Sequence, residues 1–305
     1  MTLVTYEWDA PVGSLLGHLR PDQLLLDARP ADTAATALER LRKLSPMPGT
    51  LVFHINLSQS EHWPERREAF VDAAASDGWR IVNGKTTNCT KRWVQRLCRG
   101  ARLPQVAIDD AVTADTRCIL KTDLNYGGRP ERDLSPTVRR YKGISTPSAT
   151  IECASDYRVG SFGDLVPAAL SDPGLVLERF VANAEGRYVR TYLAGDAMVV
   201  SEAVNPRDVK KMEPGLWRWN TMTKRGVVAQ DVASCARSQT SLLAETAGVD
   251  FGTLDFVVDE AGVHYAVDLN LCPGWGAESQ PDMLTHLAGG LSALERRCLD
   301  GASID

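Results

Sequence analysis

Short apolar runs alternate with longer amphipathic stretches in the first hundred residues, and this alternation constrains the fold more than any other feature. The strand-like and helix-like segments follow one another in the order 23–26, 31–44, 50–55, 64–76 and 79–82. Strands that are separated by helices favour a parallel sheet, because parallel neighbours need a long crossover connection. A further helix is predicted at residues 89–99, and Leu103-Pro104 ends the pattern. We therefore predict an N-terminal parallel α/β domain at residues 1–104.

From about residue 106 the pattern changes to strands that are joined by turns. Apolar runs predict strands at residues 117–121, 175–181, 187–193, 197–203, 253–258 and 263–269. Two short Gly-containing segments, 194–196 and 259–262, predict hairpin turns. Helical periodicity returns only at residues 235–247 and 282–298. The second part of the chain is therefore expected to contain mainly antiparallel sheet.

Composition excludes several classes of function. The 34 Lys and Arg against 39 Asp and Glu give a net charge of −5, which offers no global attraction to nucleic acid or to an anionic membrane. No apolar run approaches the roughly 20 residues that span a bilayer, and the N-terminus does not resemble a signal peptide. The 7 Cys and 5 His show no ligand spacing, which argues against a disulfide framework or a zinc site. We expect a cytoplasmic protein that binds neither nucleic acid nor membrane.

Two predicted strands near the C-terminus carry the most informative polar side chains. Asp255 lies on the first strand, and Asp268 and Asn270 lie two residues apart on the second, so the latter two share a face. Oxygen ligands of this kind suit Mg²⁺. Any single Asp on a hairpin is more often solvated, but Asp268 follows an apolar run and leads into an Asn-x-x-Pro-Gly sequence. We therefore favour a Mg²⁺ site formed by Asp255, Asp268 and Asn270.

The Asp-x-Asn sequence at 268–270 is followed by Pro-Gly at 273–274. This order, an acidic residue, one spacer and Asn before Pro-Gly, resembles the end of the large lobe in the ATP-grasp superfamily. The segment Leu-Glu-Arg-Phe-Val at 177–181 is similar to the hinge strand of that family, where backbone groups and the hinge acid bind adenine. The resemblance implies that Glu178, Phe180 and Val181 contact adenine and that Glu185 binds the ribose. It extends over most of the chain.

Three further segments resemble the phosphate-binding parts of the family. Cys-Ile-Leu-Lys at 118–121 is similar to the strand whose lysine reaches the nucleotide phosphates, and Gly127-Gly128 is similar to the loop that folds over them. The resemblance therefore implies phosphate contacts by Lys121, Gly127 and Gly128. Lys91 falls in a segment similar to the family's boundary helix. For Lys91, a phosphate contact and a place on the solvated side of that helix are equally open.

Within the superfamily, the chain is similar to the branch that contains ribosomal-protein glutamate ligase and bacterial glutathione synthetase. Arg190 lies in a segment that resembles the arginine strand after the hinge, and Arg218 lies in an Arg-x-Asn segment of this branch. The resemblance implies an ATP-grasp fold, in which a small lobe at 105–180 and a large lobe at 181–305 enclose ATP. One departure is Asp268, where most relatives have Glu. The number of Mg²⁺ ions, one or two, therefore stays open, with Mn²⁺ as a possible substitute.

The implied reaction is the ATP-dependent joining of a carboxylate and an amine through an acyl phosphate. Its substrates would be a small-molecule or peptide carboxylate and an amine, and a homo-oligomer is left open. Lys121, Arg190 and Arg218 are the side chains expected to neutralise charge during transfer. Two alternatives remain, namely a phosphotransferase that acts on a small molecule and a non-catalytic nucleotide-binding module.

Residues 129–142 form a polar stretch with five basic side chains directly after Gly127-Gly128. The stretch is too polar for a core segment, and a surface loop is the default interpretation. Its position after a predicted phosphate loop is also typical of a lid that orders over a bound ligand.

Overall fold

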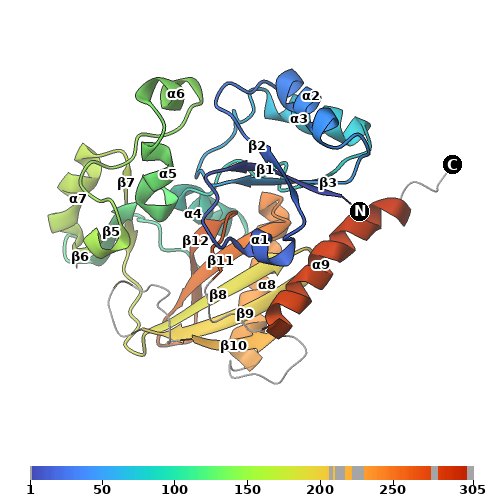
Figure 1. Cartoon of the computed structure of the whole chain (residues 1–305). Helices are drawn as coiled ribbons and strands as arrows, with labels where there is room; N and C mark the ends of the chain where they lie inside the picture. Colours follow the sequence, from blue (N-terminus) through green and yellow to red (C-terminus); the bar gives the residue numbers. More distant parts are fainter. Residues whose placement is uncertain (1, 206–208, 210–216, 222–229, 276–280, 301–305) are drawn as a thin grey trace.

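Three separate sheets build the molecule (Figure 1). The fold is that of a computed structural model, which describes residues 2–205, 209, 217–221, 230–275 and 281–300. A four-stranded sheet comes first in the chain, a three-stranded sheet second and a five-stranded sheet last. No helix among the described residues is long and apolar enough to cross a membrane.

The first sheet is parallel, as the alternation of strands and helices predicts. Its order is β2-β1-β3-β4, and its members are β1 (Leu3–Trp8), β2 (Leu24–Asp27), β3 (Thr50–Ile55) and β4 (Arg80–Val82). The crossover helices are α2 (Ala34–Leu44) and α3 (Arg67–Ser76). The predictions of β2, β3, β4 and both helices are confirmed. The sequence patterns missed strand β1 and the short helix α1 (Leu15–Leu19).

Helix α4 (Lys91–Gly100) follows the first sheet in the chain but packs elsewhere. Thr90 caps it by accepting a hydrogen bond from the Trp93 backbone N–H at 3.3 Å. Its buried side chains Val94 and Cys98 join the core of the five-stranded sheet rather than the core of the first sheet. The helix itself is confirmed, while the domain boundary at residue 104 stays a prediction.

The second sheet is antiparallel, with the order β6-β5-β7. It consists of β5 (Arg117–Thr122), β6 (Arg158–Ser161) and β7 (Leu175–Arg179), and helix α7 (Phe162–Ser171) packs against it. Between β5 and β6 the chain makes a 3₁₀ turn, η1 (Asn125–Gly128), and two short helices, α5 (Arg129–Arg132) and α6 (Pro136–Tyr141). A second 3₁₀ turn, η2 (Ala154–Asp156), precedes β6.

Two charged side chains of the 129–142 stretch, Glu131 and Lys142, are buried against the first domain, while half of the stretch is exposed as expected of a surface segment. Glu131 is fully buried and accepts a hydrogen bond from the Ser58 backbone N–H at 2.7 Å. Lys142 is also buried, with its ammonium 5.6 Å from the centre of the Trp63 ring. Leu134 lies in the core of the first sheet. Sequence polarity alone misled because one backbone N–H and one aromatic ring compensate part of the cost of burying Glu131 and Lys142.

The third sheet is the largest, and all of its pairs are antiparallel, with the order β10-β9-β8-β11-β12. Its strands are β8 (Arg187–Ala194), β9 (Ala197–Val204), β10 (Trp217–Thr221), β11 (Phe251–Val258) and β12 (His264–Asn270). Both predicted hairpins, β8–β9 and β11–β12, are confirmed.

Helices cover both faces of the third sheet. Helices α4 and α8 (Gln230–Ala247) share one core with it, and α1 and α9 (Pro281–Asp300) share another. Gly290 allows the close approach of α9, since a Cβ there would lie 2.2 Å from the Ala194 carbonyl oxygen. The edge of the sheet at β12 faces the small sheet (Figure 1), and the space between them contains the candidate site.

Candidate functional site

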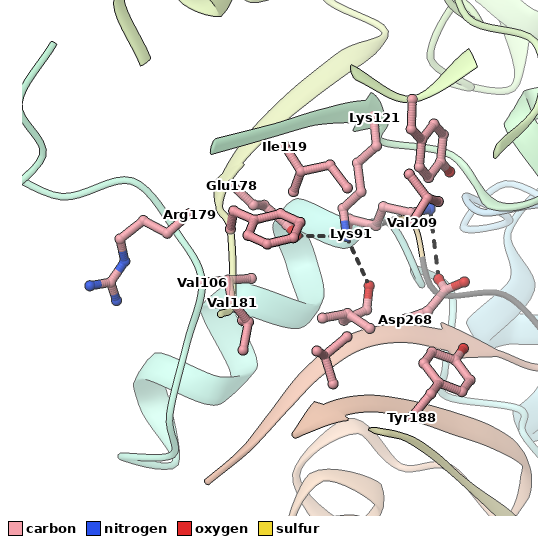
Figure 2. Close-up of a pocket in the computed structure, with 14 residues that line it drawn as sticks. Lys91, Val106, Ile119, Lys121, Glu178, Arg179, Val181, Tyr188, Val209 and Asp268 are labelled. Carbon is pink, nitrogen blue, oxygen red and sulfur yellow. Dashed lines mark hydrogen bonds and ion pairs between the residues drawn. The ribbon is translucent and has the colours of Figure 1, made fainter. Parts of the chain in front are cut away.

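A cavity lies between the small sheet and the edge of the large sheet (Figure 2). It is lined by Lys91, Val106, Ile119, Lys121, Tyr157, Glu178, Arg179, Phe180, Val181, Tyr188, Val209, Val257, Val267 and Asp268. Most of these side chains are apolar or aromatic, and a few charged groups converge among them. Such a lining is typical of a small-molecule site, in which apolar walls bind and a few polar groups orient the ligand.

One wall of the cavity comes from β5, β7 and the two residues after β7. We name it the hinge wall, formed by Ile119, Lys121, Glu178, Phe180 and Val181. Ile119 pairs directly with Glu178 across the two strands, and Lys121 lies two residues along from Ile119. These three side chains therefore lie on one face of the small sheet.

A buried ion pair occupies the hinge wall. The ammonium of Lys121 lies 2.6 Å from Oε2 of Glu178, and both side chains are more than nine-tenths buried. Burial raises the pKa of Glu178, while Lys121 acts in the opposite direction. The other carboxylate oxygen, Oε1, is buried and has no hydrogen-bond partner among the described residues. An acceptor in that state fits a ligand that carries an N–H donor.

Lys91 contributes a second buried ammonium at the start of α4. Its Nζ donates to the Leu124 carbonyl oxygen at 3.1 Å and to Asn125 Oδ1 at 3.3 Å, and it lies 3.7 Å from Asp268 Oδ1. Burial by itself lowers the pKa of Lys91, but nearby carboxylates, led by Asp268, raise it above its usual value. Lys91 therefore lies in the cavity and not on the solvated side of the helix. The exposed side of α4 carries Arg92, Arg96 and Arg99.

Asp268 on the opposite wall belongs to a row of charged residues across three strands, of which it alone lines the described cavity. Arg190 on β8 pairs with Asp255 on β11, and Asp255 pairs with Asp268 on β12. We name Arg190, Asp255, Asp268 and Asn270 together the metal edge. A bulge in the β11–β12 ladder follows Asp255 and separates the metal edge from the regular part of the hairpin.

Arg190 holds Asp255 in a two-point ion pair. Its Nε and Nη2 donate to the two carboxylate oxygens at 2.5 and 2.7 Å. Such bidentate pairs are strong and fix geometry. The predicted contact of Arg190 with a substrate stays a prediction, because in this structure Arg190 orients Asp255.

The donor set of the metal edge fits Mg²⁺ in part. Asp268 Oδ1 is buried without a hydrogen-bond partner in the described ranges, which leaves it available to a cation. Asn270 Oδ1 accepts from the Cys272 backbone N–H at 2.9 Å and retains a second lone pair. In the part of the chain that the structure describes, no three His, Cys, Asp or Glu side chains gather to hold a metal by themselves. An ion at Asp255, Asp268 and Asn270 would therefore need water or phosphate oxygens to complete its shell, as Mg²⁺ commonly does.

The two glycines after β5 have a clear packing role. Gly127 and Gly128 have φ of +69° and +75°, and a Cβ on Gly127 would lie 1.8 Å from the Glu152 carbonyl oxygen. Both are buried, and neither lines the cavity. Their predicted contact with phosphate stays a prediction.

Two predicted site residues lie away from the described cavity. Glu185 is exposed on the turn in which the Gly186 N–H donates to the Asn183 carbonyl at 3.1 Å, and its ribose contact is untested. Arg218 lies on β10, where it pairs with Glu202, but its side chain is outside the described part of the structure. The structure therefore gathers Lys91, Lys121, Glu178 and Asp268 and leaves these two apart.

Sequence patterns missed three polar residues near the site. Tyr157 lines the cavity, and Asn125 and Tyr126 contact residues of β12 or the segment that follows it. The only available signal for Asn125 and Tyr126 is their position directly after the Lys121 strand. Their partners lie more than 140 positions away in the chain and could not be read from local patterns.

Comparison with known proteins agrees with this geometry. No protein-family model matches the chain, and no curated protein sequence matches it. Among solved structures, the chain is similar to an L-amino acid ligase from Bacillus licheniformis, with a TM-score of 0.55, 11% identity and coverage of 98% of this chain and 77% of that one. It is also similar to the ATP-grasp ligase PsnB complexed with minimal precursor, with a TM-score of 0.54, 14% identity and coverage of 96% and 99%.

A third similar structure contains the nucleotide. The D-alanine–D-alanine ligase from Bacillus anthracis complexed with ATP matches with a TM-score of 0.52 at 9% identity, over 98% of this chain and 97% of that one. Identities this low establish the arrangement of the chain and not its activity. The parallel N-terminal sheet followed by two antiparallel lobes is the ATP-grasp fold.

Proposed function

We propose that the protein is an ATP-dependent carboxylate–amine ligase, which forms an amide through an acyl phosphate and releases ADP and phosphate. One observation carries the proposal. Glu178 and Asp268, on opposite walls of one cavity, each keep a buried carboxylate oxygen without a hydrogen-bond partner in the described residues. The Lys121 ammonium lies 2.6 Å from Glu178 Oε2, and the Lys91 ammonium lies 3.7 Å from Asp268 Oδ1. A ligand with an N–H donor at one end and phosphates with a cation at the other would satisfy all four groups.

The similar structures belong to enzymes named as ligases, which supports the same reaction class. They are an L-amino acid ligase, an ATP-grasp ligase with a minimal precursor and a D-alanine–D-alanine ligase with ATP. We therefore propose a small-molecule or peptide carboxylate and an amine as substrates. The finer similarity to the branch of ribosomal-protein glutamate ligase and bacterial glutathione synthetase rests on Arg190 and Arg218 alone.

ATP would lie with its base on the hinge wall. The free Oε1 of Glu178 would accept a hydrogen bond from the adenine amino group, and the backbone of Phe180 and Val181 would bind the ring edge. Glu185 would accept from the ribose hydroxyls. Lys121 and Lys91 would then donate to phosphate oxygens. Gly127 and Gly128 would belong to the loop that covers the phosphates.

The chemical problem is the approach of an anionic carboxylate to a polyanionic phosphate. A substrate carboxylate oxygen bonds to the γ-phosphorus as the bond to the ADP oxygen breaks. The amine nitrogen then bonds to the acyl carbon, phosphate leaves with the former carboxylate oxygen, and the nitrogen loses a proton. Lys91, Lys121 and Arg218 would neutralise charge during these steps. A Mg²⁺ ion held by Asp255, Asp268 and Asn270 would supply further electrostatic stabilisation.

An ADP-release screen of carboxylates crossed with amino acids and other amines tests the proposal. A ligase gives ADP and phosphate in amounts that depend on both substrates, and mass spectrometry detects the amide. Formation of a stable phosphorylated product would instead identify a phosphotransferase. Tight ATP binding without turnover would identify a nucleotide-binding module. The Asp268→Asn variant serves as the matched blank for every positive combination.

A further inference from the structure

The turn formed by Asn125 and Tyr126 connects the small sheet to the metal edge of the large one. It follows β5 directly, yet its side chains bond to residues at the end of β12. Asn125 Nδ2 donates to the Leu269 carbonyl oxygen at 2.7 Å, and its backbone N–H donates to Ser58 Oγ at 2.8 Å. Asn125 is thus buried, and it joins the segment after β3 to the end of β12.

Asn125 also sets the direction of the Lys91 ammonium. That group has three N–H donors, and two of its acceptors are Asn125 Oδ1 and the Leu124 carbonyl oxygen. One acceptor is a side-chain oxygen and the other a backbone oxygen of adjacent residues, so together they direct the remaining N–H away from the turn. Asp268 Oδ1, 3.7 Å from Nζ, lies on the cavity side of the ammonium.

Tyr126 holds Asn270 of the metal edge and Cys272, which follows it. Its hydroxyl accepts a hydrogen bond from Asn270 Nδ2 at 2.6 Å and donates to the Cys272 carbonyl oxygen at 3.0 Å. With the Asn125 bond to Leu269, the turn therefore fixes the chain at 269, 270 and 272. This segment begins directly after Asp268.

The backbone of the turn is strained in favour of these contacts. Tyr126 has φ of +50° and ψ of 28°, a left-handed conformation that is uncommon for a residue with a bulky side chain. Strain of this kind persists only where the surrounding structure imposes it, and it concentrates at functional sites. A glycine would adopt this backbone more readily but would lack the hydroxyl that bonds Asn270.

We propose that Asn125 and Tyr126 are positioning residues for the phosphate and metal end of the site. Asn125 aims the Lys91 ammonium at the phosphates, and Tyr126 turns the Asn270 amide so that its oxygen faces the cation. The inference deepens the proposed function and rests on it. Neither residue contacts the reacting atoms; each acts through a neighbour, as outer-shell partners of metal ligands do.

Tyr126→Phe tests the metal arm, because it removes one hydroxyl and leaves the ring. We expect the affinity for Mn²⁺, measured by electron paramagnetic resonance in the presence of a non-hydrolysable ATP analogue, to fall on the order of tenfold. Affinity for the analogue without metal should stay within about twofold, and the melting temperature should be unchanged. Tyr141→Phe is the matched control. Tyr141 lies on α6, and the change removes an exposed hydroxyl that donates to Glu65 at 2.6 Å. Equal Mn²⁺ affinity in Tyr126→Phe and the parent would overturn the role of Tyr126.

Asn125→Ala in combination with Lys91→Met tests the phosphate arm. If Asn125 acts through Lys91, Asn125→Ala weakens metal-free binding of the analogue in the parent but has no further effect in Lys91→Met, so the two changes are not additive. Additive losses would overturn this role.

Asn125→Asp keeps the test decisive if the alanine variant does not fold. Asp retains the acceptor for Lys91 and lacks the donor for Leu269. Its added negative charge should weaken metal-free binding of the analogue, and if Asn125 acts through Lys91 the size of this loss should differ between the parent and Lys91→Met backgrounds. Equal losses in the two backgrounds would overturn the inference.

The failure of this inference and the failure of the proposed function give different results. If the parent binds no nucleotide by calorimetry, with or without Mg²⁺, both the proposed function and the inference are wrong. If the parent binds nucleotide and forms product while every Asn125 and Tyr126 variant behaves like the parent, only the positioning roles are wrong.

Discussion

The hinge wall and the metal edge each contain a buried carboxylate paired with a cation, but the two pairs are built differently. On the hinge wall, Lys121 bonds only one oxygen of Glu178 and leaves the other without a partner in the described structure. On the metal edge, Arg190 bonds both oxygens of Asp255, and the oxygen without a hydrogen-bond partner in the described structure belongs to the neighbouring Asp268.

This difference separates two tasks. A pair with one free oxygen in an apolar wall is suited to bind and orient a neutral base, and its loss should weaken affinity. A carboxylate with a free oxygen next to a fixed ion pair is suited to hold a cation where charge develops, and its loss should lower the rate. The hinge wall should therefore control nucleotide affinity, and the metal edge should control turnover.

The largest expected effect is that of Asp268→Asn on turnover. Removing the charge that holds Mg²⁺ costs several kcal/mol of transition-state stabilisation, or on the order of 10³-fold in rate. Metal-free nucleotide affinity should hold or rise, because Lys91 loses its nearest carboxylate. ADP release and calorimetry on the same preparation measure the two quantities. A purified variant with near-parent turnover would show that Asp268 is not a metal ligand.

Lys121→Met should lower nucleotide affinity and stability together. It leaves Glu178 buried and unpaired, which costs about 3–5 kcal/mol when one partner of a buried pair is removed. The double variant Lys121→Met, Glu178→Leu should recover most of the stability but not the affinity for ATP. Urea unfolding and calorimetry separate these effects. Full recovery of affinity in the double variant would show that the hinge wall binds no nucleotide.

A smaller effect is expected for Glu185→Gln, which lies beyond the hinge wall. Loss of a hydrogen bond to the ribose should weaken ATP binding by about 0.5–1.5 kcal/mol. The KM for ATP should rise accordingly, with kcat little changed. The variant should also discriminate less between ATP and 2′-deoxy-ATP. If the variant instead requires much more Mg²⁺ and its preference for ATP over 2′-deoxy-ATP is unchanged, Glu185 belongs to the metal edge. The separation of the hinge wall from the metal edge would then be wrong.

Glu131 offers a control outside both regions, with the smallest expected effect. Its Oε2 is also buried without a partner in the described part of the chain, yet it does not line the cavity. Burial raises its pKa above the usual 4.5, so its favourable contribution to stability is present below pH 4.5 and is lost as pH rises through the folded-state pKa. Glu131→Gln does not titrate and can still accept from Ser58.

The stability of Glu131→Gln relative to the parent should therefore increase from pH 4.5 to pH 8. Urea unfolding at several pH values measures this change, and ADP release should be unaffected. A relative stability that stays constant or decreases over this range would show that burial does not disfavour the ionised form of Glu131.

Local patterns were sufficient for most of the fold. The alternation of apolar runs and helices predicted the parallel first sheet, and period-two runs with Gly-containing turns predicted both hairpins of the large sheet. Strand β1 was missed because Leu3–Trp8 mixes buried polar and apolar residues at the centre of a parallel sheet, where both faces are covered. Burial of Glu131 and Lys142 in the 129–142 stretch was missed because it depends on Ser58 and Trp63, which are distant in the sequence.

The residues of the candidate site also fall into those that local patterns predicted and those that they missed. Spacing within strands was sufficient to predict Lys121, Glu178 and the set of Asp255, Asp268 and Asn270 as site residues, in that order along the chain. Only the folded arrangement shows that Lys91 points into the cavity, that Arg190 holds Asp255, and that Asn125 and Tyr126 contact the end of β12. Each of these depends on which side chains from distant segments satisfy one another's hydrogen bonds once they are removed from water, and spacing along the chain does not encode those pairings.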